Sequence, residues 1–148
     1  MGRQVDKNQS FNTKLRAKLN KDDLKMCLTR FREYTICSPN ITQLETDVRK
    51  VYEVFSESGK DNLSKRRDHF WVGATKTLNF MFPELFVIVD SNVKKAVHRV
   101  GDLYFTKYWD IMMICQEELR EWEQQYGNLD NLLRLDVKTT LTRIFDKC

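Results

Sequence analysis

The stretch Val72–Gly101 reads VGATKTLNFMFPELFVIVDSNVKKAVHRVG and decides the fold expected for this chain. Its first part belongs to a helix predicted over about residues 68–82, in which apolar or small side chains recur every three or four residues on one side. Pro83 ends that helix, because proline disfavours helical dihedrals in the residue before it. The stretch therefore begins as a helix that is broken by a proline.

The apolar run FVIV, Phe86–Val89, follows the proline. No second strand-like run exists to pair with it, and a lone strand would leave its backbone polar groups without partners. We therefore predict a buried loop or a helical turn here. The run delivers one carboxylate, Asp90, to the head of a short helix predicted over Ser91–Val100. An acid that follows so apolar a run has a specific task more often than a typical surface aspartate does.

The rest of the chain also has a helical period, with apolar residues at three- and four-residue spacing. The further predicted helices cover about residues 22–37, 40–59, 102–126 and 129–145. Asp22 or Asp23 can cap the first of these, and Gly127 suits the C-terminal end of the third. The longest apolar stripes lie in Ile41–Ser58 and Leu103–Tyr126. The sequence thus predicts an all-α fold of six or seven helices in a single domain spanning residues 1–148, with residues 1–10 as a flexible basic tail.

The composition is that of a soluble globular protein, with 41% hydrophobic and 31% charged residues in a chain of 148. FVIV is too short to span a bilayer and no secretory signal is evident, so we expect an intracellular protein without a membrane partner. The four cysteines lack C-x-x-C spacing and are expected to be reduced: Cys27, Cys37, Cys115 and Cys148. No phosphate-binding, dinucleotide or zinc motif is present. We therefore expect no metal and no cofactor.

The net charge of +4 is unevenly distributed. Residues 1–32 contain nine Lys or Arg against three Asp, and acids concentrate in 117–123. Further basic clusters are Lys60, Lys65, Arg66 and Arg67, and then Lys94, Lys95 and Arg99. Such clusters fit a nucleic-acid phosphate footprint, although any one of them taken alone is more often a solvated helix face.

VDSNVKKAVHRVG resembles the pattern V-D-[TS]-H-V-x-R-x-x-x-R-[LV]-G of the helix-hairpin-helix DNA glycosylases of the endonuclease III type. VGATKT is similar to the second half of that family's hairpin, L-P-G-V-G-x-K-T-A. Trp71 stands at the hairpin's first glycine, and Asn92 replaces the usual histidine. Lys76 comes one place after the family's nucleophile position, which Thr75 occupies. The similarity covers residues 72–101.

The resemblance implies a glycosylase-like helical fold in which Asp90 is the catalytic carboxylate and Lys76 is the candidate amine nucleophile. Asp90 is also an excellent helix N-cap, and the two roles are compatible. Gly73 can let a backbone amide approach a phosphate, or can serve close helix packing. The implied nucleic-acid contacts are Lys65, Arg66, Arg67, Gly73, Lys94, Lys95 and Arg99.

Two functions follow from these observations. The first is a protein that binds DNA, or RNA, with a glycosylase-like fold and base excision by Asp90. The second is a non-enzymatic helical module that binds nucleic acid or protein. The tryptophans, phenylalanines and tyrosines can stack on a flipped base, yet aromatic side chains on helix stripes more often form the core. The oligomeric state is not fixed by the sequence.

Overall fold

The computed structural model describes residues 13, 16–58, 71–96 and 103–127. The elements bounded in these residues are all helical, which confirms the all-α prediction: α2 (Asp22–Phe31), the 3₁₀ helix η1 (Ile41–Leu44), α3 (Glu45–Ser58), α4 (Trp71–Met81), α5 (Ser91–Ala96) and α6 (Phe105–Tyr126). The basic tail over 1–10 and the helix predicted over 129–145 lie outside the described residues, as do 97–100 of the helix expected to reach Val100.

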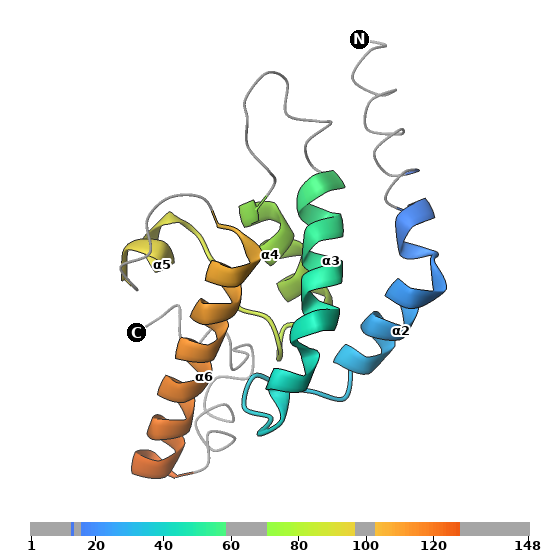
Figure 1. Ribbon diagram of the computed structural model, residues 1–148. Coiled ribbons are helices and arrows are strands. Elements are labelled where there is room, and N and C mark those ends of the chain that lie inside the picture. The colour runs from blue at the N-terminus through green and yellow to red at the C-terminus, as the bar shows by residue number, and fades with distance from the viewer. Residues whose placement is uncertain (1–12, 14–15, 59–70, 97–102, 128–148) are drawn as a thin grey trace.

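Helix α3 is the centre of the described fold, because α2, α4 and α6 all contact it. Figure 1 shows α3 between α2 on one side and α4 and α6 on the other. Its apolar stripe, predicted from three- and four-residue spacing, is fully buried together with that of η1: Ile41, Leu44, Val48, Val51 and Phe55. The amphipathic pattern of this helix was therefore a correct guide to the core.

A stack of aromatic rings joins α3 to α4 and α6. The ring of Tyr52 lies 4.9 Å from that of Tyr108 and 5.6 Å from that of Trp71, nearly parallel to both. Ring pairs of this kind contribute roughly 0.5–1.5 kcal/mol beyond the area they bury. The sequence predicted that aromatic residues on the apolar faces of helices belong to the core. This is confirmed for Tyr52 and Tyr108, which are fully buried.

The first predicted helix is shorter than expected and is capped differently. It ends at Phe31 rather than near Cys37, because Ile36 is fully buried and its N–H donates to the Glu84 carbonyl at 2.9 Å. That long-range hydrogen bond replaces the one that a continued helix would make. Lys21 occupies the N-cap position, so the prediction of an aspartate cap is wrong. Both aspartates instead lie in the first turn, where a negative charge interacts favourably with the helix N-terminus.

The long helix α6 starts at Phe105, three residues later than predicted, and its apolar stripe is buried only as far as Leu119. Trp122 is 38% exposed and Tyr126 is 62% exposed, so the stripe continues beyond the described core. Gly127 ends the helix with φ +87°, a backbone region in which glycine has no side-chain penalty. The prediction that Gly127 ends the helix is confirmed.

Tyr108→Phe is expected to lower the free energy of unfolding by about 1–3 kcal/mol, because a buried carbonyl would lose its donor. The hydroxyl of Tyr108 donates to the Val87 carbonyl at 3.1 Å, and burial raises the pKa of Tyr108 well above its usual value, so the hydroxyl keeps its proton. Urea denaturation measures the loss. Tyr126→Phe removes the same atom from a 62% exposed side chain and serves as the matched control. Equal stability of the two variants would contradict this account.

Candidate functional site

The segment Leu85–Val89 is not helical, and no strand in the described part of the chain pairs with it. The Phe82 carbonyl accepts from the N–H groups of Leu85 and Phe86, and side chains satisfy three further backbone groups. The amide of Asn79 donates to the Phe86 carbonyl at 2.6 Å, and the hydroxyl of Tyr108 donates to that of Val87 at 3.1 Å. The N–H of Val89 donates to the Thr75 hydroxyl at 3.2 Å. The prediction of a buried loop is confirmed, and these hydrogen bonds are the reason that no partner strand is needed.

Thr75 is a fully buried residue on the inner face of α4. Its hydroxyl donates to the Val72 carbonyl at 2.9 Å and accepts from Val89, so one oxygen uses both its donor and an acceptor position. The helix-internal bond fixes the direction of the hydroxyl. The Val89 bond attaches α4 to the residue directly before Asp90.

Asp90 is a half-buried N-cap of α5. Its Oδ1 accepts hydrogen bonds from the N–H groups of Asn92 at 2.8 Å and of Val93 at 3.0 Å. The capping role predicted from the sequence is thereby confirmed. Within the described part of the chain, no group donates a hydrogen bond to Oδ2. One carboxylate oxygen is thus committed to the helix and the other is outside the cap.

Lys76 and Thr75 lie on different sides of α4. Thr75 faces the segment that leads to Asp90, whereas the Lys76 side chain is exposed. Successive residues of a helix are turned by about 100° from each other, so the one-place displacement of the lysine from the family pattern becomes a change of face. The structure therefore brings Thr75, and not Lys76, to the backbone beside the carboxylate.

The remaining predicted contact residues are only partly described. Gly73 is half-buried in α4, where its carbonyl accepts from the Thr77 hydroxyl at 2.9 Å. Lys95 is exposed on α5, and Lys94 lies in the same helix. The others lie outside the described residues: Lys65, Arg66, Arg67 and Arg99, and with them both histidines, His69 and His98.

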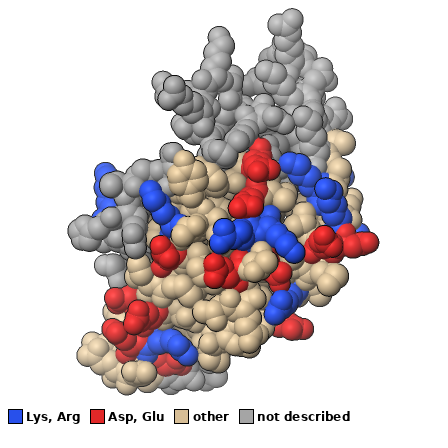
Figure 2. All heavy atoms as spheres, viewed as in Figure 1, with Lys and Arg blue, Asp and Glu red and all other residues tan. Residues whose placement is uncertain are grey.

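The face of the molecule shown in Figure 2 carries charges of both signs. Basic and acidic side chains alternate across this face. The acids of α6 lie close together in sequence and are exposed: Glu117, Glu118, Glu121 and Glu123. A phosphate backbone would be repelled from that half of α6, so a nucleic-acid footprint has to lie elsewhere on the molecule.

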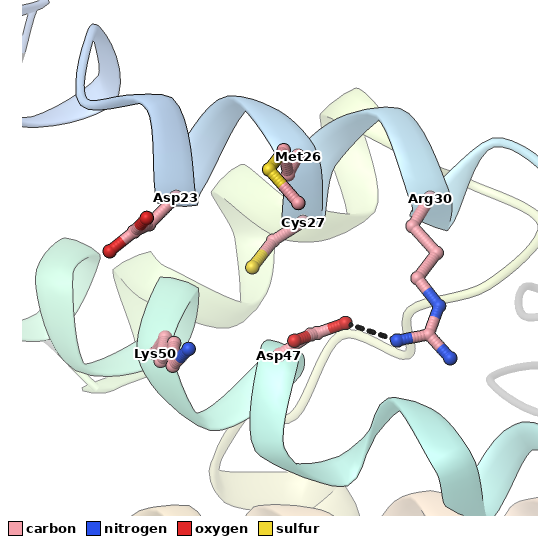
Figure 3. A pocket seen from close by; sticks show the side chains of 6 residues that line it. All are labelled: Asp23, Met26, Cys27, Arg30, Asp47 and Lys50. Atoms are coloured by element: carbon pink, nitrogen blue, oxygen red, sulfur yellow. Dashed lines mark hydrogen bonds and ion pairs between the residues drawn. The ribbon is translucent and has the colours of Figure 1, made fainter.

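A hollow of about 250 Å³ opens between α2 and α3. Figure 3 shows its lining, in which Asp23, Cys27 and Arg30 come from successive turns of α2 and Asp47 and Lys50 come from α3. Arg30 forms an ion pair with Asp47 at 2.9 Å. The sequence interpretation followed the apolar face of α2 and missed this polar one, although its three- and four-residue spacing was visible.

The thiol in this hollow is not set up as a nucleophile. Burial, followed by the neighbouring Asp47 carboxylate, raises the pKa of the Cys27 thiol and keeps it protonated at neutral pH. Among the described residues, Cys27, Cys37 and Cys115 form no disulfide, and Cys148 lies outside them. In the described residues, no group of three or more His, Cys, Asp or Glu side chains is arranged to hold a metal ion. The hollow lies between α2 and α3, and its lining residues indicate no reaction.

Comparisons with protein families, with curated proteins and with solved structures find no match to this chain. The helices of the described part include none with the length and apolar character that a membrane crossing needs.

Asp90→Ala is expected to lower the free energy of unfolding by about 0.5–2 kcal/mol, because two N–H groups of α5 would lose their acceptor. Asp90→Asn should leave stability nearly unchanged, since asparagine caps a helix about as well as aspartate. Chemical denaturation of both variants beside the wild type tests the cap. Equal losses in the two variants would mean that the charge matters here and the hydrogen bonds do not.

Proposed function

We propose that this chain binds DNA through the side that carries Asp90 and α5, with a helical fold like that of the helix-hairpin-helix glycosylases. One observation supports this proposal above the others. Asp90 stands at the head of α5, with Oδ1 held by two backbone N–H groups and Oδ2 outside the cap. The family pattern that VDSNV resembles has its catalytic aspartate at this place in the motif.

The proposed chemistry is base excision assisted by this carboxylate. Two backbone donors on Oδ1 stabilise its negative charge, as charge-assisted hydrogen bonds do. The carboxylate would take a proton from an attacking water and would stabilise the positive charge that develops on the deoxyribose as the base leaves. The water oxygen then bonds to the sugar carbon, the carbon–nitrogen bond breaks, and the base departs with the bonding electron pair.

Water, and not Lys76, is the nucleophile in this proposal. The α4 position that faces the Asp90 segment is held by Thr75, whose hydroxyl is already engaged on both sides. A nucleophilic lysine is usually desolvated in a pocket, and the Lys76 side chain is exposed. Lys76 then has no part in the reaction, and Lys95 on α5 supplies a positive charge for phosphate groups.

Lys65, Arg66 and Arg67 complete the proposed phosphate contacts, because only three residues separate Arg67 from the first residue of α4. Replacing all three by Ala should reduce the slope of log K against log salt by roughly one unit per lost contact. Fluorescence anisotropy with a labelled duplex, measured over a salt series, gives the slope. Arg120→Ala removes an exposed cation from among the glutamates of α6 and should keep the wild-type slope. Absence of DNA and RNA binding at low salt would exclude the proposal.

Asp90→Asn should keep DNA affinity and reduce base excision by about 10²–10⁴-fold, the usual contribution of a positioned acid or base. The substrates are duplexes with uracil, an oxidised base, an alkylated base or an abasic site. Lys76→Ala should excise as the wild type does, and borohydride should trap no covalent complex with DNA. Excision retained in Asp90→Asn would show that another group does the chemistry. A trapped complex that depends on Lys76 would reverse the assignment of the nucleophile.

A second candidate is a non-enzymatic module that binds nucleic acid or protein without reacting. The observation in its favour is that the Asp90 carboxylate already has a structural task as the cap of α5. The same measurements distinguish the two candidates. A wild-type protein that binds DNA and is inert on all four substrates is the module, and Asp90→Asn would then match the wild type in every assay.

A further inference from the structure

We infer that Thr75 and Asn79 are positioning residues for Asp90, which they hold in place through the backbone of Leu85–Val89. This inference rests on the proposed function in so far as it concerns DNA. Thr75 and Asn79 lie one helical turn apart on the buried face of α4. They contact the segment at Val89 and at Phe86, so α4 is attached to it at two points.

The two attachment points fix the direction of the segment. The later residue of α4, Asn79, binds the earlier residue of the segment, Phe86. The earlier residue, Thr75, binds the later one, Val89. The segment therefore runs back along α4, antiparallel to it, and its end is the residue before Asp90.

Apolar burial alone would not hold this register. The segment is buried at Leu85, Phe86, Val87 and Val89, which supplies the driving force for packing it into the core. That force is non-directional, and a neighbouring apolar side chain can satisfy it nearly as well. Only the hydrogen bonds specify which N–H and which carbonyl meet α4.

The register decides where the carboxylate points. Val89 is bonded to Thr75, and the next residue places Oδ1 on the N–H groups of Asn92 and Val93. Releasing Val89 would give the backbone before Asp90 freedom to rotate, and the cap and the position of Oδ2 would change together. Thr75 contacts neither the substrate nor the Asp90 carboxylate, so its role is to fix where the carboxylate lies.

Thr75→Val tests this inference, because valine has nearly the same shape and lacks the hydroxyl. Amide hydrogen exchange, read residue by residue by NMR in the DNA-free protein, should speed up at Val89, Asn92 and Val93 by about 2- to 10-fold, as the loss of one hydrogen bond predicts. Thr75→Ser keeps the hydroxyl and should restore the slow exchange. Thr75→Ala replaces the valine variant if that one does not fold.

Ile41→Val is the matched control, because it removes one methyl group from a fully buried residue of η1. It should lower overall stability without a selective effect at Asn92 and Val93. Wild-type exchange at those two amides in Thr75→Val and Thr75→Ala would overturn the positioning role. So would faster exchange of equal size in Ile41→Val, since the effect would then report global stability only.

The DNA arm of the experiment is separate. If Asp90 excises a base, Thr75→Val should lower kcat by about 10²-fold with KM little changed, since a displacement near 1 Å has that effect on a reacting group. Thr75→Ser should recover the rate. A wild type that is inert on DNA refutes the proposed function and leaves the exchange result to decide the positioning role. An active Thr75→Val with wild-type kcat overturns the inference while the proposed function stands.

Discussion

The described fold depends on keeping an apolar, non-helical segment inside a helical protein. Among the described residues no strand lies beside Leu85–Val89, and each buried backbone group left without a partner would cost about as much as a lost hydrogen bond. Polar side chains of α4 and α6 provide these partners from within the core. The fold therefore requires Asn79 and Thr75 to be buried although they are polar. Helix α4, which carries both, must pack where their side chains reach this segment.

Much of this arrangement follows from the sequence, because it rests on local patterns. The stripe of α3, the stop at Pro83 and the cap at Asp90 each depend on residues within a few positions of one another. Even the absence of a strand could be argued, since FVIV has no second run to pair with. The aromatic stripe of α6 was correctly assigned to the core at Tyr108, whereas Trp122 and Tyr126 on the same stripe are exposed.

The features that sequence reasoning missed depend on residues far apart along the chain. The early end of α2 follows from the bond between Ile36 and Glu84, which no local pattern encodes. The Cys27 hollow needs α2 and α3 to lie side by side before its charges meet. The hydrogen-bond partner of the Val89 N–H could not be predicted either. In the sequence Thr75 is an ordinary helix residue, and only the antiparallel packing of α4 and the segment brings its hydroxyl to Val89.

Thr75 is where this chain differs from the pattern that its sequence resembles, and the difference lies on the buried face of α4. Thr75 faces the Asp90 segment from the position at which the resembled pattern has a lysine. Its hydroxyl is hydrogen-bonded to the backbone of Val72 and of Val89. An amine one place later falls on another face of the helix, because each residue turns it by about 100°. The Asp90 carboxylate lies at the head of α5, supported by backbone N–H groups and without the lysine on its own side of α4. The proposed reaction therefore depends on Oδ2, the oxygen that the cap does not occupy.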